Sequence, residues 1–397
     1  MPRPARLTPA LLGVLGFIAA VGPFATDMYL ASFTDIATSL GTGAAPVQLT
    51  LTAFFIGMSL GQLCNGPLSD KFGRRPVLLI ALGIFVASSV AMVFTPTIEL
   101  FIALRLLQGL SGSAGVVIAR AIASDLSEGE TAVRALSLIS MVIALGPLVA
   151  PPVGGVLATV FDWRGVLAVL AAISILMFVL SLVFVPESHP REARPAGHWL
   201  NAFASFGTLL RDPAYVGYTL AFAFGFASMM SYISASPFVG QTVLGMSPLT
   251  YSLSFAAGGL ALVLANLTNA RLAPQFGVGR MLAIGIGAQL AAGAAYLALA
   301  ATGALSIPTF IALAFITTAG AGYAMANASA LALSRVTPQT RGAGAALLGA
   351  TQFGVGAIVS PLVGFWGEDT AVPMAACIVA TAAIAAGCAT VARRASR

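Results

Sequence analysis

Twelve long apolar stretches alternate with short polar ones along the chain. They cover about 9–38, 47–68, 76–96, 98–124, 132–159, 163–186, 213–240, 249–272, 280–302, 305–334, 342–366 and 370–392. A helix needs about 20 apolar residues to cross the hydrocarbon core of a bilayer, so each stretch is long enough. The pattern therefore predicts an all-α membrane protein with twelve transmembrane helices.

The composition leads to the same class of protein. Of the 397 residues, 58% are hydrophobic and only 8% are charged, whereas soluble domains carry about 25% charged residues. A water-soluble fold could not bury this much apolar surface. The N-terminus is not expected to be a cleaved signal, because Arg3 and Arg6 precede an apolar stretch that is too long for a signal core.

The basic residues collect on one side of the predicted membrane. If both termini share a side, that side holds 16 of the 19 Lys and Arg residues: Arg3, Arg6, Lys71, Arg74, Arg75, Arg134, Arg191, Arg194, Arg211, Arg271, Arg280, Arg335, Arg341, Arg393, Arg394 and Arg397. Cytoplasmic loops carry such an excess. We expect a multi-pass protein of the inner (plasma) membrane with cytoplasmic termini. These charges orient the spans, so no nucleic-acid partner is expected.

A weak internal repeat divides the chain. Phe72-Gly73 recurs as Phe276-Gly277 with an offset of 276 − 72 = 204 residues. We expect a six-helix half at 1–186, a cytoplasmic linker at 187–212 and a second, pseudo-symmetric six-helix half at 213–397. Apolar residues near helical spacing in the linker suggest a short amphipathic helix on the membrane surface, the alternative being a flexible linker; they are Trp199, Leu200, Phe203, Phe206, Leu209 and Leu210.

The short loop between the second and third spans reads Gly66-Pro-Leu-Ser-Asp-Lys-Phe-Gly-Arg-Arg-Pro76. Its spacing of glycine, acidic and basic residues resembles the signature loop of the major facilitator superfamily. The resemblance implies the major facilitator fold, a monomer, and a cytoplasmic gate in which Asp125 pairs with Arg74 while Asp70 caps the eleventh span near Arg341. The expected gate residues are Gly66, Asp70, Gly73, Arg74, Arg75, Arg120 and Asp125.

The fifth span contains prolines and glycines within one apolar stretch. Proline interrupts helical hydrogen bonding, and glycine permits close helix packing. The pattern Gly146, Pro147, Pro151, Gly154 and Gly155 resembles the antiporter motif of drug-exporting branches, although Ala150 replaces its central glycine. The alternative is a kinked helix that has no bearing on transport direction.

Charged residues inside the spans are few. Asp27 is the only carboxylate well inside one, and no Asp or Glu lies between Asp212 and Glu368. Buried carboxylates are costly but can carry protons, so Asp27 is the expected proton carrier. Arg105 lies at a similar depth in the fourth span and is the expected partner, released when Asp27 is protonated. The alternative for Asp27 is a structural partner of an arginine or a residue at the membrane edge, and the alternative for Arg105 is a purely structural role.

Three further stretches are similar to the bicyclomycin/chloramphenicol-resistance (Bcr/CflA) branch of proton-coupled drug exporters: 26–30, 232–239 and 341–359. This resemblance implies export of drugs such as chloramphenicol or bicyclomycin. One acid and two arginines in the membrane favour a neutral or weakly charged substrate. The expected substrate cavity residues, each of which could instead bond a neighbouring helix, are Tyr29, Gln108, Ser228, Tyr232, Tyr323, Asn327 and Gln352.

Two other functions were weighed. A major facilitator transporter of a sugar or other metabolite would share the fold, but the fifth-span motif disfavours it. A membrane-embedded enzyme would need a cluster of nucleophile, acid–base or metal-binding residues in the spans, and the sequence offers none. No enzyme activity, cofactor or metal is therefore expected. The three cysteines lie in apolar stretches, which favours buried thiols over a disulfide.

Overall fold

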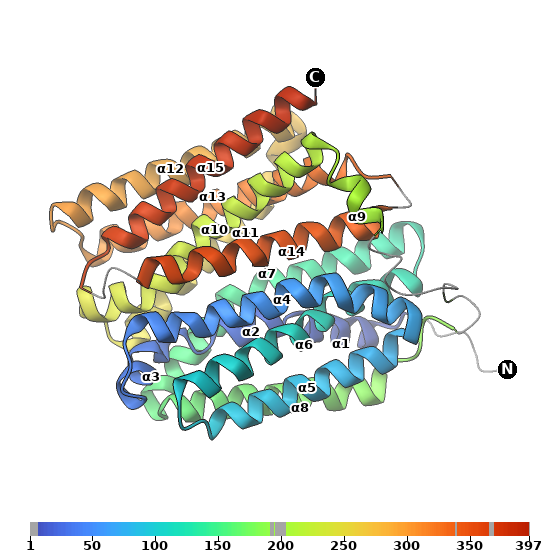
Figure 1. Cartoon of the computed structure of the whole chain (residues 1–397), viewed down its shortest axis with the longest axis horizontal. Coiled ribbons are helices and arrows are strands. Elements are labelled where there is room, and N and C mark those ends of the chain that lie inside the picture. The colour runs from blue at the N-terminus through green and yellow to red at the C-terminus, as the bar shows by residue number, and fades with distance from the viewer. Residues whose placement is uncertain (1–6, 191–193, 195–203, 338–339, 365–368, 397) are drawn as a thin grey trace.

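The computed structural model describes the chain except residues 1–6, 191–193, 195–203, 338–339, 365–368 and 397 (Figure 1). The described part is helical and contains no strand. Twelve of its segments are long and apolar enough to cross a membrane, which confirms the predicted fold class. Their helices are α1 Pro9–Ala19, α2 Val21–Asp27, η1 Leu30–Ser32, α3 Phe33–Ser39, α4 Ala44–Phe72, α5 Arg74–Val93, α6 Ile98–Asp125, α7 Gly129–Val160, α8 Trp163–Phe184, α10 Pro213–Phe238, η4 Val239–Val243, α11 Pro248–Phe276, α12 Val278–Ala301, α13 Ile307–Leu333, α14 Arg341–Val359, η6 Ser360–Gly364 and α15 Val372–Ala395.

The first span differs from its prediction because it is not one continuous helix. It breaks after Ala19 and again after Asp27. Pro23 has no N–H for the carbonyl of Ala19, four residues earlier, which explains the first break. At the second break the Thr26 hydroxyl donates to the Gly22 carbonyl at 3.0 Å. Such back-bonding bends helices, so the local sequence already weakens the helix where Asp27 lies.

Several helices begin where the sequence offers an N-cap. The side chains of Thr97, Asp162 and Ser247 accept backbone N–H groups from the first turns of α6, α8 and α11. An N-cap satisfies a donor that the helix itself leaves unpaired. These short polar turns allow consecutive spans to run antiparallel with little intervening chain.

The internal repeat is present in the backbone. Helices α4 and α11 each span 29 residues, with the same offset at both ends, 248 − 44 = 204 and 276 − 72 = 204. Each ends at a glycine with positive φ, +102° at Gly73 and +87° at Gly277. Only glycine adopts this conformation readily, so the tight turn requires it. The second copy carries Pro274, Val278 and Gly279 in place of the charges of the first.

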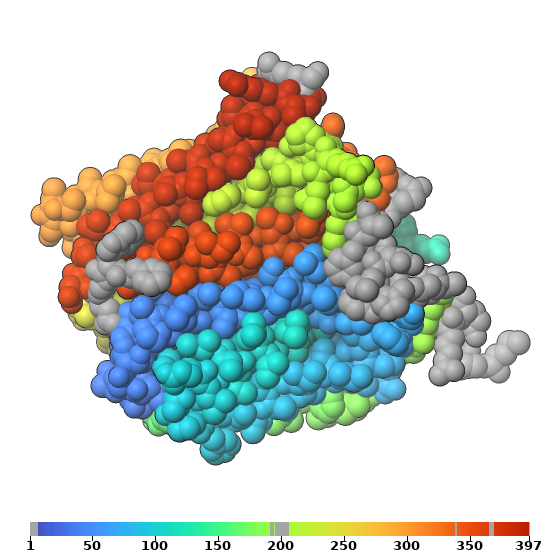
Figure 2. All heavy atoms as spheres, in the orientation of Figure 1, coloured from blue at the N-terminus to red at the C-terminus, as the bar shows by residue number. Residues whose placement is uncertain are grey.

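The spans pack as two groups. Helices α1–α8 form one group, here the N-terminal group, and α10–α15 form the other, the C-terminal group (Figure 1). The groups meet where α4 packs on α14 and α7 packs on α11. In the space-filling view, blue α4 lies directly against orange α14 (Figure 2). One side of the bundle is here called the termini end, because both termini lie there (Figure 1). It also holds the C-terminal ends of α4, α6, α8, α11, α13 and α15. The opposite side is called the far end.

The connection between the groups contains one short helix. Helix α9 covers Ala204–Leu209, with Leu209 buried and Leu210 exposed. The expected amphipathic helix began at Trp199, and Trp199, Leu200 and Phe203 lie outside the described residues. The described portion is therefore helical over six residues only.

Candidate functional site

Asp27 is the last residue of α2, where the first span breaks. Its side chain is only 5% exposed. The Thr26 hydroxyl lies 2.9 Å from Asp27 Oδ1. Because α2 ends here, the last-turn carbonyls lack helical partners, and this end of the helix carries a partial negative charge. The carboxyl group therefore lies in a polar break inside an otherwise apolar bundle.

Arg105 of α6 reaches the same break and is fully buried. Its Nη1 donates to the Ala25 carbonyl at 2.9 Å and to Gln108 Oε1 at 2.6 Å. The guanidinium carbon lies 4.1 Å from the ring centroid of Tyr29 and 4.8 Å from that of Phe54. Such cation–π contacts stabilise a desolvated cation by about 2 kcal/mol. A carbonyl, an amide and two aromatic faces thus hold the charge.

This arrangement corrects one expectation. Asp27 and Arg105 lie at similar depth, but no ion pair joins them among the described residues. The break in the first span explains the difference, because the Ala25 carbonyl at the end of α2 attracts the guanidinium. Pro23 and Thr26 indicated a weakened helix here, but which side chain would take the free carbonyl depends on how α6 packs against the first span.

Four of the seven expected cavity residues are engaged with neighbouring groups. Gln108 donates to Ser89, Ser228 to the Ile378 carbonyl and Asn327 to Asn269, with donor–acceptor distances of 2.8, 3.3 and 2.7 Å. The Tyr323 hydroxyl lies 2.6 Å from Thr268 Oγ1. These contacts match the alternative of helix–helix bonding and speak against a cavity-lining role in this conformation.

The other three expected cavity residues differ from one another. The Tyr29 hydroxyl lies 2.9 Å from Thr50 Oγ1, and its ring faces Arg105. Gln352 of α14 is partly exposed. Tyr232 of α10 is 1% exposed, and within the described chain its hydroxyl has no hydrogen-bond partner. Tyr232 and Gln352 therefore remain available to a ligand.

The glycines of α7 bring the first span and α11 close together. A Cβ at Gly146 would overlap Pro23, and one at Gly154 would overlap the Met28 carbonyl beside Asp27. On the other side, a Cβ at Gly155 would overlap Ser252 of α11. The neighbouring Pro147 and Pro151 lie within the helix. This stretch of α7 therefore links the surroundings of Asp27 directly to the C-terminal group.

The charged loop at the termini end forms a compact ion-pair cluster. Arg74 Nε lies 3.0 Å from Asp125 Oδ2, as expected, and Arg74 also pairs with Asp70. Arg75 donates to the Leu182 carbonyl at 3.0 Å. Gly73 makes the tight turn before α5.

The linker start joins this cluster. Glu187 Oε1 accepts the backbone N–H of Arg74 at 3.0 Å, and Ser188 donates to Asp125 at 2.8 Å. Glu187 Oε2 lies 3.6 Å from Arg194. Sequence reasoning did not place Glu187 in the gate, although the Pro186-Glu187-Ser188 stretch after the sixth span was a visible signal.

Three of the expected gate residues make no gate contact of the expected kind in this conformation. Asp70 does not cap α14, because its carboxylate pairs with Arg74 and the N-cap Thr340 has no side-chain cap bond. The nearest atom to a Cβ at Gly66 would be Val117 Cγ1 at 3.7 Å, so no backbone approaches closely there. Arg120 is exposed and makes no ion pair among the described residues.

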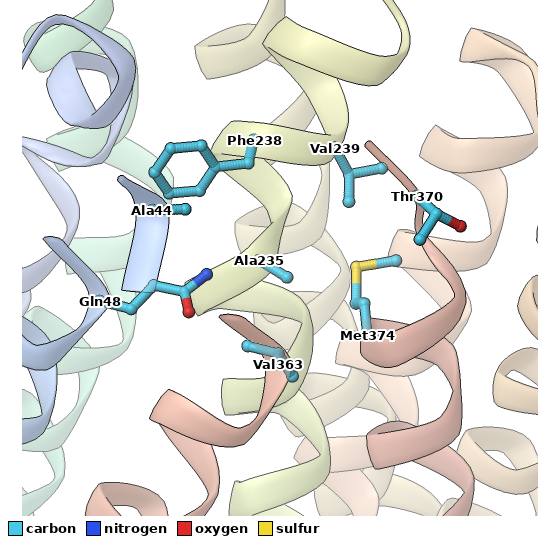
Figure 3. A pocket seen from close by; sticks show the side chains of 8 residues that line it. All are labelled: Ala44, Gln48, Ala235, Phe238, Val239, Val363, Thr370 and Met374. Carbon is cyan, nitrogen blue, oxygen red and sulfur yellow. The ribbon is translucent and has the colours of Figure 1, made fainter. Parts of the chain in front are cut away.

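The two groups are instead joined near the far end. Gln48 donates to the Ser234 carbonyl at 3.2 Å, and Figure 3 shows its amide reaching from α4 toward α10. Gln241 donates to the Ala31 carbonyl at 3.2 Å and accepts from Thr34 at 3.1 Å. We call these three bonds the far-end latch. It contains no charged side chain.

A further hydrogen bond between the groups lies deeper, where Ser59 of α4 donates to the Ala350 carbonyl of α14 at 2.8 Å. Nearby, Phe55 of α4 packs on Phe226 of α10 and Phe353 of α14. The far-end latch therefore closes the bundle at the far end, and Ser59 adds a bond deeper between the groups.

Three features together define a membrane transporter. They are the twelve spans in two groups, the charged turn after the second span and the polar break in the first span. The chain matches the Major Facilitator Superfamily over residues 15–392 and belongs to that family. Family and fold are those of transporters.

Individual proteins similar to this chain are found within and beyond its sequence relatives. The chain is 35% identical to a bicyclomycin resistance protein homolog of Haemophilus influenzae over 373 residues, 92% of each chain. It is 33% identical to a chloramphenicol resistance protein of Pseudomonas aeruginosa over 308 residues, 77% of this chain and 71% of the relative. A bacterial homolog of the lysosomal transporter Spinster, solved in an inward-facing conformation, superposes with a TM-score of 0.73 at 18% identity and covers 98% of each chain. That likeness concerns the fold alone.

Proposed function

We propose that this protein is a proton-driven antiporter that exports neutral or weakly charged drugs such as chloramphenicol or bicyclomycin. The observation that carries the proposal is Asp27, a carboxyl group almost fully buried at a break in the first span. Intramembrane carboxyl groups are rare and typically belong to proton or ion pathways. The names of the resistance-protein relatives support a drug substrate.

The proposed cycle is alternating access by two six-helix halves, 1–186 and 213–397, joined by the linker 187–212. The conformation described above, closed at the far end, is the inward-facing state of this cycle. Asp27 is loaded by a proton from outside as the drug leaves, and it releases that proton to the inside before the next drug is carried out. The glycines of α7 transmit the change, because they contact both Met28 and α11.

The orientation follows from charge. Described arginines at the termini end include Arg134, Arg271, Arg280, Arg393 and Arg394, whereas Arg164 lies at the far end. Cytoplasmic loops carry such an excess of basic residues. We place the termini end in the cytoplasm and the protein in the inner (plasma) membrane, acting as a monomer.

Chloramphenicol accumulation in cells tests the proposal. Cells expressing the wild type should accumulate less drug than cells without it, and a protonophore should abolish the difference. Asp27→Asn should reach the membrane but fail to lower accumulation. Glu99→Gln, at an exposed acid in the first turn of α6, is the matched control and should export normally.

Three outcomes would overturn parts of the proposal. Normal export by Asp27→Asn would exclude Asp27 as the proton carrier. Export that persists with the protonophore would exclude proton coupling. If the wild type exports neither chloramphenicol nor bicyclomycin, the drug substrate is wrong, and transport of a sugar or other metabolite becomes the better hypothesis.

A further inference from the structure

A small pocket lies in the C-terminal group beside the kinked helix α7. Its lining includes Pro147 of α7, Met229 and Tyr232 of α10, Phe255 and Leu262 of α11, and Thr318 of α13. None of the lining residues is an acid or a base. The pocket is separate from the latch region of Figure 3.

The Tyr232 hydroxyl is the unusual group of this pocket. The side chain is 1% exposed, and the hydroxyl has no hydrogen-bond partner in the described chain. Its polar neighbour Ser236 already donates to the Ile233 carbonyl at 3.1 Å and lies 2.9 Å from the Tyr251 hydroxyl. A buried polar group without a partner is unfavourable, so a ligand that bonds this hydroxyl removes that penalty.

The ring of Tyr232 is fixed in place. It stacks on Phe255 with centroids 5.8 Å apart and a 19° interplanar angle, and it contacts Phe310 at 5.9 Å. Other polar groups of the wall are committed, since the Thr318 hydroxyl donates to the Ala314 carbonyl at 2.8 Å. The pocket therefore presents one preorganised hydroxyl within apolar walls.

Two glycines give the pocket its room and its connection to the N-terminal group. A Cβ at Gly258 would lie 3.2 Å from Thr318 Oγ1, inside the space that the pocket occupies. A Cβ at Gly259 would lie 2.6 Å from the Pro147 carbonyl. The pocket floor thus includes the contact between α7 and α11, which must change when the two halves rock.

We propose that this small pocket is a specificity subsite for a small uncharged group of the substrate that carries one hydrogen-bonding atom for the Tyr232 hydroxyl. The subsite deepens the proposed function and rests on it. A charged group is excluded because no lining residue could pair with it, and an unpaired buried charge is strongly unfavourable.

Equilibrium binding of radiolabelled chloramphenicol to the purified full chain in lipid nanodiscs tests the subsite. Chloramphenicol is an uncharged aromatic nitro compound with hydrogen-bonding atoms. Tyr232→Phe deletes only the hydroxyl and should weaken binding about threefold to tenfold. Gly258→Ala fills the pocket and should weaken binding about tenfold. The matched controls are Tyr296→Phe, whose hydroxyl bonds the Phe310 carbonyl, and Gly287→Ala, whose Cβ meets nothing within 4 Å.

A stability measurement separates loss of the subsite from misfolding. Tyr232→Phe should unfold at the wild-type temperature or higher, because it removes an unpartnered buried hydroxyl. Tyr296→Phe should unfold at a lower temperature, because it removes the hydrogen bond from the Tyr296 hydroxyl to the Phe310 carbonyl, yet it should bind the drug normally.

The outcomes distinguish the two proposals. Binding that weakens in Tyr232→Phe and Gly258→Ala, without protonophore-sensitive export by the wild type, would support the pocket and overturn the antiporter. Protonophore-sensitive export with unchanged binding in both variants would overturn the pocket and leave the antiporter standing. Failure of the purified wild type to bind chloramphenicol would also overturn the pocket as a site for this class of compound.

Discussion

Arg105 is held by the Ala25 carbonyl, 2.9 Å from Nη1, and not by the carboxylate of Asp27. The broken first span exposes this carbonyl at the C-terminal end of α2, where a cation is favoured. The charge state of Asp27 can therefore change without removing the main partners of Arg105. In the proposed cycle, Asp27 therefore carries the proton while Arg105 anchors the first span.

The first prediction compares the stability of two variants. Asp27→Asn keeps an acceptor for the Thr26 hydroxyl and should change the free energy of unfolding by less than about 1 kcal/mol. Arg105→Gln leaves the Ala25 carbonyl unpaired and should cost about 1–3 kcal/mol. Thermal unfolding of both purified variants measures this difference. Equal, large losses in both would indicate a hidden Asp27–Arg105 pair, since breaking a buried pair from either side costs about 3–5 kcal/mol.

The second prediction concerns the close contact between α7 and the first span. Gly154→Ala places a methyl group against the Met28 carbonyl, and overpacking of this kind costs about 1–3 kcal/mol. Drug export should fall strongly, because the methyl group displaces the backbone next to Asp27. Gly13→Ala is the control, since its Cβ would meet nothing within 4 Å. Full export by Gly154→Ala would show that this contact has no role in transport.

The third prediction concerns the far-end latch. Gln241→Leu removes two hydrogen bonds between the groups, and at about 0.5–1.5 kcal/mol each this should shift the equilibrium toward far-end opening about tenfold. Spin labels at Thr42 and Thr302, in a background without the native Cys64, Cys377 and Cys388, report the opening as a longer distance. Thr38→Val is the control, because Thr38 bonds only within α3.

The latch should also be insensitive to salt. Its bonds join amide and hydroxyl groups to carbonyls, so ionic strength has no ion pair to screen there. The same label distance measured from low to high salt should stay constant. A strong salt dependence would indicate that charged groups outside the latch control this end.

The fourth prediction is an exchange of partners by Asp70. When the far end opens, α14 should approach the charged loop, and Asp70 should leave Arg74 for the N-terminus of α14, where a carboxylate is favoured by about 0.3–1 kcal/mol. Cysteines at the exposed Phe72 and Gly342 should then cross-link more readily in the Gln241→Leu background. Adding Asp70→Asn should reduce that gain. Equal cross-linking with and without Asp70→Asn would contradict the exchange.

The fifth prediction concerns Asp212, which lies where the linker meets the C-terminal group. Asp212 caps α10 by accepting from the N–H groups of Ala214 and Tyr215 at 2.8 and 3.3 Å, and Arg335 lies 3.1 Å away. Partial burial raises the pKa of this carboxyl group, but these donors outweigh it and hold the pKa below its usual value. Its stabilising effect is therefore present above about pH 4 and is lost as the pH falls below that value.

Two variants at this position separate the cap from the charge. Asp212→Ala removes the cap and should cost about 0.5–2 kcal/mol at neutral pH, whereas Asp212→Asn should cost less because Asn also caps helices. Thermal unfolding is measured between pH 7 and pH 3. The unfolding temperature of the wild type should approach that of Asp212→Asn as the pH falls to 3. A constant difference over the whole range would show that the charge contributes nothing.

The amino-acid sequence by itself determined the number of spans, the paired repeats and the location of the charged turn. Those features depend on local properties: the length of apolar stretches, the positive φ of Gly73 and Gly277, and the distribution of arginines. The resemblance to the major facilitator signature loop also implied that Arg74 pairs with Asp125, and the structure contains that pair. A water-soluble fold could not bury twelve helices of this composition. These predictions therefore needed no tertiary information.

The tertiary structure decided which polar groups meet. The position of the break at Asp27 depends on packing against α7 and α6, so the pairing of Arg105 with a backbone carbonyl was invisible in the sequence. Helical spacing likewise could not tell that Asn327 faces Asn269 while Tyr232 faces an apolar pocket. Side chains four residues apart share a helix face, but only the relative rotation and tilt of neighbouring helices determine what that face contacts.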